Sequence, residues 1–110
     1  MSADDTILRT AIRARRQVKI EYGPAWKFIL EPYVLFHDSK NQRILYGHTW
    51  ASDPVAYLKG SREFLVEQIT SIELLDGTYE RPQEDYFVRN WTHVRIDCDV
   101  YCPTATALLA

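Results

Sequence analysis

The sequence predicts a mainly β domain with one helix at its N-terminus. Two observations lead to this fold class. Apolar residues recur at helical spacing only in the first sixteen positions, and several later segments alternate apolar and polar residues in the way that half-buried strands do. Turn-forming residues separate these segments. At 110 residues, the chain is long enough to bury a single core.

Residues 2–16 are predicted to form the helix. Ser2 is suited to cap its first turn. The apolar positions at helical spacing are Leu8, Ala11 and Ile12. Basic side chains gather at the other end, where the helix dipole favours cations; they are Arg13, Arg15 and Arg16. They therefore have either a structural role or a role in binding phosphate.

Strands are predicted at residues 18–22, 26–36, 43–50, 62–66 and 71–75. Pro32 interrupts the second of these. Because proline cannot donate to a strand ladder, it marks an edge, a bulge or a bend there. The sequence thus predicts five strands that follow the helix, with a bend in the longest one.

The polar segment 81–85 contains Pro82 and predicts a boundary, so we divide the chain into residues 1–82 and an extension of residues 83–110. Alternation from residue 94 to 102 predicts one more strand in the extension. Trp91 either forms an exposed interaction patch or covers an open end of the core, and we favour the second interpretation. Residues 103–110 are expected to be loosely held.

Composition excludes some classes of protein. The formal net charge of −2 argues against a protein that binds nucleic acid through an overall positive charge, although a local basic site is compatible with it. No apolar run approaches the ~20 residues that span a bilayer. The N-terminus is acidic where a signal peptide would be basic, so we expect a cytoplasmic protein.

No catalytic, cofactor or metal motif is found. The chain has no Gly-rich phosphate loop, no Gly-x-Ser-x-Gly and no His-Glu-x-x-His, so we expect no enzymatic activity and no cofactor. On a continuous strand Cys98 and Cys102 lie about 13 Å apart, too far for a disulfide. His93 precedes them, but a second ligand pair of standard spacing is missing, so no zinc site is predicted.

Two strands carry the candidate binding residues. On strand 43–50, strict alternation places Tyr46, His48 and Trp50 on one face. A polar ring between aromatic rings is typical of a pocket lining, although a histidine at the rim of the sheet is the plainer interpretation of His48.

Arg62 is the other candidate, because it shares the face of its strand with Phe64 and Val66. A guanidinium on an apolar face must either reach solvent or meet an anion. The structural alternative is an ion pair with one of three acidic residues, Glu31, Glu63 or Glu67.

Taken in order, several segments over residues 7–82 resemble the WYL domain, a small barrel of bacterial regulators. The resemblance lies in the basic helix end Ala11-Ile12-Arg13-Ala14-Arg15-Arg16, and in Val18-Lys19-Ile20-Glu21-Tyr22, Leu30-Glu31-Pro32-Tyr33-Val34-Leu35, Arg43-Ile44-Leu45-Tyr46-Gly47-His48, Arg62-x-Phe64 and Ile69-x-x-Ile72-Glu73-Leu74-Leu75.

The resemblance implies an Sm-like (SH3-like) barrel of about five strands in residues 1–82, behind an N-terminal helix. It also implies a non-enzymatic, ligand-sensing regulatory module, whose ligand would be a nucleotide or single-stranded nucleic acid. Arg62 would contact phosphate, Tyr46, His48 and Phe64 would line the site, and Trp50 would stack on a base.

The chain also departs from the family pattern. It reads Arg43-Ile44-Leu45 where the family has Trp-Tyr-Leu, and Leu65 and Gln68 stand where the family often has basic residues. These departures and the acidic net charge favour the alternative function, a protein-interaction or oligomerisation module, such as a homodimer, that binds no nucleic acid. No helix-turn-helix pattern precedes the helix, so operator binding would need a partner.

Overall fold

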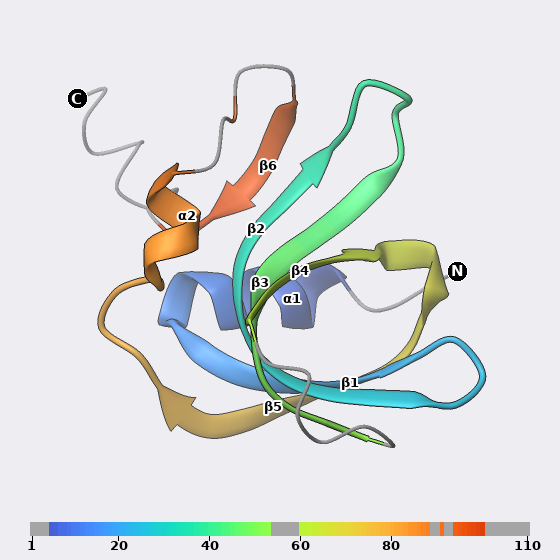
Figure 1. The fold of residues 1–110 in the computed structure, drawn as a ribbon, viewed down its shortest axis with the longest axis vertical. Coiled ribbons are helices and arrows are strands. Elements are labelled where there is room, and N and C mark those ends of the chain that lie inside the picture. The colour runs from blue at the N-terminus through green and yellow to red at the C-terminus, as the bar shows by residue number, and fades with distance from the viewer. Residues whose placement is uncertain (1–4, 54–59, 89–90, 92–93, 101–110) are drawn as a thin grey trace.

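The computed structural model describes residues 5–53, 60–88, 91 and 94–100. It is mainly β, with one N-terminal helix against a strongly curved antiparallel sheet (Figure 1). The elements in chain order are α1 (Asp5–Ala14), β1 (Arg16–Tyr22), β2 (Trp26–His37), β3 (Arg43–Asp53), β4 (Gly60–Leu65), the 3-10 turn η1 (Val66–Gln68), β5 (Ile69–Thr78), α2 (Glu84–Val88) and β6 (Arg95–Asp99).

The strand order is β4-β3-β2-β1-β5, and β6 pairs with β2 beside this path. The expected fold class, a small mainly β domain with a barrel-like sheet and an N-terminal helix, is confirmed. Strands β4 and β5 form the two ends of the path, and η1 joins them. All five predicted strands are present, and the strand expected in the extension is β6.

Strand β2 organises the sheet. It pairs with β3 along most of its length, with β1 through residues 26–30, and with β6 through residues 34–37. The change of partner falls at Pro32, where the register with β3 also shifts before Val34. The bend expected at this proline is therefore confirmed. Pro32 has no N–H to donate, and it lies between the part of β2 that pairs with β1 and the part that pairs with β6.

Helix α1 ends at Ala14, two residues earlier than predicted, because Arg15 takes a positive φ of 53°. The side chain of Arg15 donates to the carbonyl of Glu80, and Nε of Arg16 donates to the carbonyl of Leu75 at 2.8 Å. The structural interpretation of these two arginines is confirmed. Arg13 is exposed, and Ser2 lies outside the described residues.

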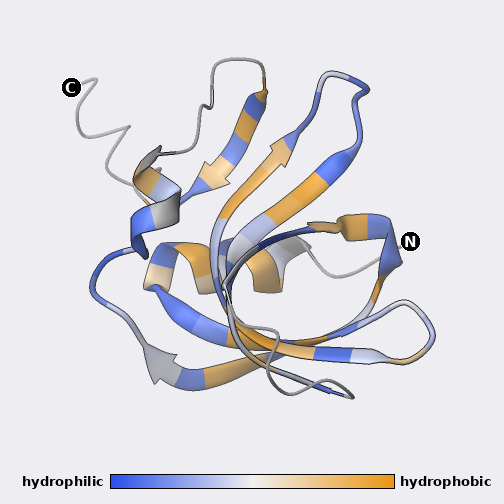
Figure 2. Ribbon diagram, in the orientation of Figure 1, coloured by the Kyte–Doolittle hydropathy of each residue, from blue (hydrophilic) through white to orange (hydrophobic). Residues whose placement is uncertain are grey.

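One apolar core joins the helix to the sheet. Leu8 and Ile12 of α1 are fully buried with Val18, Leu30 and Leu45 of the first three strands. Figure 2 shows the alternation along the strands that produces this core, with hydrophobic positions between hydrophilic ones. The packing of a narrow helix face on a curved sheet is what the periodicities predict.

The segment after β5 returns to the sheet. It contains the short helix α2, which the sequence did not predict because five residues carry no helical period. Trp91 packs edge-on against Phe36 and Tyr46, with ring centroids 5.4 and 5.2 Å apart, so its interpretation as a cover over the core is confirmed.

Strand β6 adds a buried cysteine, Cys98, to the core. Next to Cys98 on the same strand, Oδ2 of Asp97 lies 2.7 Å from Nδ1 of His37, and a proton on Nδ1 lets these two buried atoms satisfy each other. His93, Cys102 and residues 103–110 lie outside the described residues.

The close approach of β2 and β3 generates a prediction at Gly47. A Cβ there would lie 2.3 Å from the carbonyl oxygen of Glu31, which belongs to the backbone and cannot turn away. We expect Gly47→Ala to lower the free energy of unfolding by about 1–3 kcal/mol or more, as overpacking does. Urea unfolding followed by circular dichroism measures this change.

Gly77→Ala is the matched control. A Cβ at Gly77 would approach only the flexible side chain of Gln17, so we expect a change within about 0.5 kcal/mol. Equal stabilities of the two variants would contradict the close packing of β2 on β3.

Candidate ligand-binding site

The pairing of β3 with β4 divides the candidate residues between two faces of the sheet. Gly47 pairs with Arg62 and Leu45 with Phe64, whereas Tyr46 pairs with Glu63. Directly paired residues project to the same side of a sheet. Arg62 and Phe64 therefore lie together on one face.

The remaining three candidates lie on the opposite face. Tyr46, His48 and Trp50 alternate along β3, and His48 pairs with Ser61 rather than with Arg62. The structure thus brings together two of the predicted site residues and separates them from the other three.

Arg62 and Phe64 line a pocket of about 270 Å³. Its described lining comes from β1, β2 and β4 and consists of Tyr22, Trp26, Phe28, Arg62, Glu63 and Phe64. Four of these six side chains are aromatic. A mostly aromatic lining with few polar groups is typical of small-molecule sites.

The aromatic rings hold one another in place. Phe28 lies edge-on to Phe64, with centroids 4.9 Å apart, and Tyr22 lies edge-on to Phe64 at 5.1 Å. Trp26 stacks on Phe28, with an interplanar angle of 9° and centroids 5.7 Å apart. The hydroxyl of Tyr22 also accepts a hydrogen bond from the N–H of Leu65 at 3.0 Å. The wall of the pocket is therefore preformed.

Arg62 is half-buried, and its guanidinium carbon lies 5.6 Å from the ring centroid of Phe28, a cation–π contact. Its Nε is buried and has no hydrogen-bond partner among the described residues. A buried, unsatisfied donor on a charged group is costly, so it favours an acceptor from outside the chain.

The structural alternative for Arg62 was an ion pair with one of three acids. In the described part of the chain no such pair joins Arg62 to Glu31, Glu63 or Glu67. The carboxylate of Glu31 is engaged on the other face, where it accepts hydrogen bonds from Nε1 of Trp50 at 2.7 Å and from the hydroxyl of Tyr33 at 2.5 Å.

The face that carries Trp50 is largely structural. Tyr46 is buried against Tyr33 and Trp91. His48 packs edge-on to Trp50, with centroids 4.7 Å apart, and its Nδ1 is buried without a partner in the described residues. Trp50 itself is 38% exposed, but its indole N–H is held by Glu31.

Two tyrosines near Glu31 have raised pKa values. Burial, and then the hydrogen bond to Glu31, raise the pKa of Tyr33 well above its ordinary value. Burial, and then the charge of Glu31, raise the pKa of Tyr79 in the same direction. Both hydroxyls donate, Tyr33 to Glu31 and Tyr79 to the carbonyl of Pro32 at 2.6 Å, so both must stay protonated for this network to persist.

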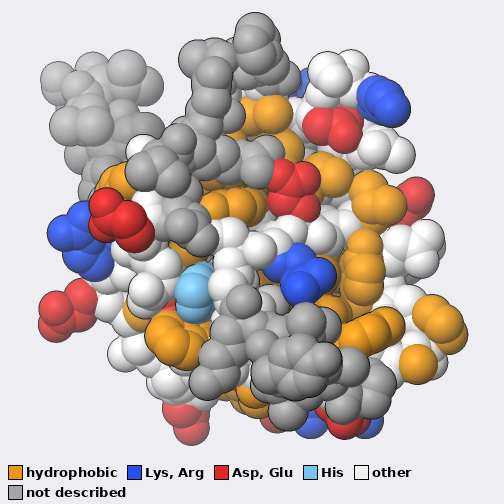
Figure 3. Space-filling view, viewed as in Figure 1, with side chains coloured by type: hydrophobic (Ala, Val, Ile, Leu, Met, Phe, Trp, Pro, Cys, Tyr) orange, Lys and Arg blue, Asp and Glu red, His pale blue; other side chains and the backbone are white. Residues whose placement is uncertain are grey.

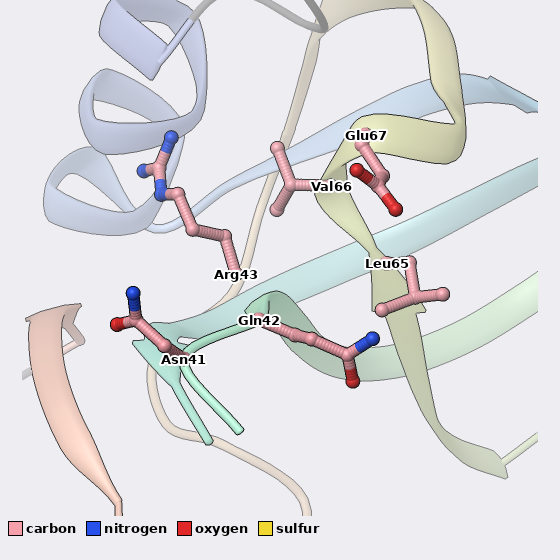
Figure 4. Close-up of a pocket in the computed structure, with 6 residues that line it drawn as sticks. All are labelled: Asn41, Gln42, Arg43, Leu65, Val66 and Glu67. Atoms are coloured by element: carbon pink, nitrogen blue, oxygen red, sulfur yellow. The ribbon is translucent and has the colours of Figure 1, made fainter. Parts of the chain in front are cut away.

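Two other pockets are less suited to a specific ligand. One, of about 320 Å³, lies between the β2–β3 turn and the start of η1 and has no aromatic residue (Figure 4); its lining is Asn41, Gln42, Arg43, Leu65, Val66 and Glu67. The other, of about 290 Å³, includes Lys19 and Lys27, but these pair across strands with Ile29, Glu73, Glu21 and Asp53, so the two cations sit on a face of alternating charge.

No group of three histidine, cysteine or acidic side chains in the described residues is placed to hold a metal ion. Figure 3 shows one face of the molecule, on which acidic, basic and apolar side chains are interspersed and no large patch of one charge forms. Among the described residues, no helix has the length and apolar character needed to cross a membrane.

Sequence reasoning missed three lining residues, Tyr22, Trp26 and Phe28. A signal was present: Gly23 and Pro24 predict a tight turn, and such a turn places Tyr22 opposite Trp26, as observed in the β1–β2 register. Alternation then puts Phe28 on the same face.

The fold has a counterpart among solved structures. No family model and no curated protein matches the chain. The structure is similar to proteasome accessory factor B/C (PafBC) of Arthrobacter aurescens, with a TM-score of 0.60 and 15% sequence identity over 82% of this chain. This likeness concerns the fold alone. The match spans 15% of the length of PafBC, so it corresponds to a small part of that protein.

The raised pKa values of Tyr33 and Tyr79 predict a loss of stability in alkali. Above about pH 10 the unfolded chain loses both protons whereas the folded chain keeps them, so rising pH favours unfolding. Averaged over pH 9 to 11, each tyrosine contributes about 0.7 kcal/mol per pH unit to this slope, because the unfolded side chain is half ionised at about pH 10. Urea unfolding between pH 9 and 11 measures it.

Tyr79→Phe removes one of the two groups. We expect the variant to lose stability with pH less steeply, by about 0.7 kcal/mol per unit averaged over pH 9 to 11, whatever its stability at neutral pH. A slope equal to that of the wild type would show that Tyr79 ionises normally in the folded protein.

Proposed function

We propose that this chain is a non-enzymatic, ligand-sensing regulatory module that binds a nucleotide or single-stranded nucleic acid at the pocket of Arg62. The observation that carries the proposal is the buried, unpartnered Nε of Arg62 inside an aromatic pocket. Guanidinium groups match the geometry of phosphate, and aromatic rings offer a surface on which bases stack.

The predicted family relationship belongs to the same proposal. The ordered segments that resemble the WYL domain and the similar fold of PafBC both support a WYL-like regulatory module. We propose that it acts in the cytoplasm, as expected from the acidic N-terminus. The proposed roles of two predicted residues, Arg62 as the phosphate contact and Phe64 as part of the lining, agree with the pocket. We assign the stacking role to Trp26, which is half-buried and itself stacks on Phe28.

A protein-interaction module is the second candidate. Phe87 and Ile96 are 42% and 38% exposed, and we take these two apolar side chains as the candidate contacts of such a module. In this case Arg62 would serve packing alone, through its contact with Phe28.

Titration of fluorescently labelled single-stranded DNA and RNA, and of nucleotides, tests the proposal at low and moderate salt. We expect wild-type binding to weaken with salt, and Arg62→Ala to weaken it at least tenfold, the size of a lost charged hydrogen bond. Arg62→Lys keeps the charge but loses Nε, so we expect intermediate binding.

Arg13→Gln is the matched control, since Arg13 is an exposed arginine on α1 and its loss changes the net charge equally. We expect it to bind as the wild type does. If no ligand binds the wild type and Arg62→Ala lowers the melting temperature, the interaction module is the better description.

A further inference from the structure

The described lining of the Arg62 pocket contains a single cation. Arg62 is basic and Glu63 is acidic, while the other four described lining residues are aromatic. Lys27 stands between Trp26 and Phe28 on β2, so alternation directs it to the opposite face of the sheet, where it pairs with Glu21 and Asp53. Glu63 pairs with Tyr46, so alternation directs its side chain to the opposite face as well, and no second cation for another phosphate is found among the described lining residues.

The stacking surface is equally limited. Phe28 and Phe64 are 4% and 1% exposed, so their rings are covered by neighbours. Trp26 and Tyr22 are half-buried, and the hydroxyl of Tyr22 is held by the N–H of Leu65. Trp26 therefore offers the largest ring that a ligand can reach.

The pocket is also small. Its volume of about 270 Å³ lies just below the range of roughly 300–1,000 Å³ that is usual for drug-sized ligands. There is room for one planar ring system and one anionic group beside it.

From these three limits we propose that the pocket takes one aromatic anion, with its ring on Trp26 and its single phosphate or carboxylate on Arg62. A nucleoside monophosphate fits this description, and a longer strand gains nothing from its additional phosphates. This inference rests on the proposed function and narrows its ligand class.

Calorimetric titration of the whole chain with adenosine, adenosine monophosphate and a twelve-residue oligodeoxyadenylate tests the proposal on the wild type. We expect the monophosphate to bind at least tenfold more tightly than the nucleoside. The oligomer should bind no more tightly per nucleotide than the monophosphate. For the oligomer, the logarithm of affinity should fall against the logarithm of salt concentration with a slope of about −0.7, as for one phosphate neutralised on a single strand.

Two tryptophan variants test where the ring of the ligand binds. We expect Trp26→Ala to weaken the monophosphate roughly 5- to 150-fold, the usual range for a stacked base. Trp50→Phe alters a tryptophan on the opposite face and should leave binding unchanged. Circular dichroism confirms that each variant is folded, and the wild-type comparison of ligand lengths stands without them.

Different results would contradict the single-anion inference, the location of the ring and the proposed function. Tighter binding of the oligomer per nucleotide, with a salt slope steeper than −2, would overturn the single-anion inference and leave the proposed function in place. Loss of binding in Trp50→Phe with retention in Trp26→Ala would overturn the location. No binding of any of the three ligands would overturn the proposed function itself.

Discussion

The structure depends on strand β2, because every other strand except β4 and β5 hydrogen-bonds to it directly. One edge of β2 serves β1 and then β6, and the change occurs at Pro32, the one residue type that cannot donate to either. The opposite edge follows β3, where the absence of a side chain at Gly47 permits the two backbones to approach closely. A proline and a glycine thus fix the bend around which the core and the pocket are built.

Alternation along the strands then determines which side chains lie on the same face of the sheet and can act together. Arg62 and Phe64 face the aromatic wall of β1 and β2, while Glu31 and Trp50 join a hydrogen-bond network on the other side of the same sheet. On one side the carboxylate of Glu31 is satisfied by Trp50 and Tyr33, although Nδ1 of His48 beside Trp50 has no partner among the described residues. On the other side the unsatisfied atom belongs to a charged guanidinium and lies in an aromatic pocket, and these two features together favour it as the binding site.

Much of the fold could be predicted from the sequence, because period-two alternation marks β1 to β4 and a helical period marks α1. Helix α2 could not, since its five residues are set by tertiary contacts of Tyr86 rather than by local pattern. The site could be predicted only in part. Alternation along β4 was enough to place Arg62 and Phe64 on one face. The contact of these two residues with Trp26 and Phe28 depends on how the sheet brings β2 and β4 together, and the pattern of a single segment does not predict that.

The pairing of β6 with β2 also bears on where the folding unit ends. A chain that stopped at residue 82 would leave residues 34–37 of β2 as an open ladder of N–H and C=O groups, beside apolar side chains such as Leu35 and Phe36. Such an edge is a template for pairing with another molecule. Strand β6 therefore covers this edge of β2, and a change that removed β6 would expose backbone groups able to pair with a second molecule.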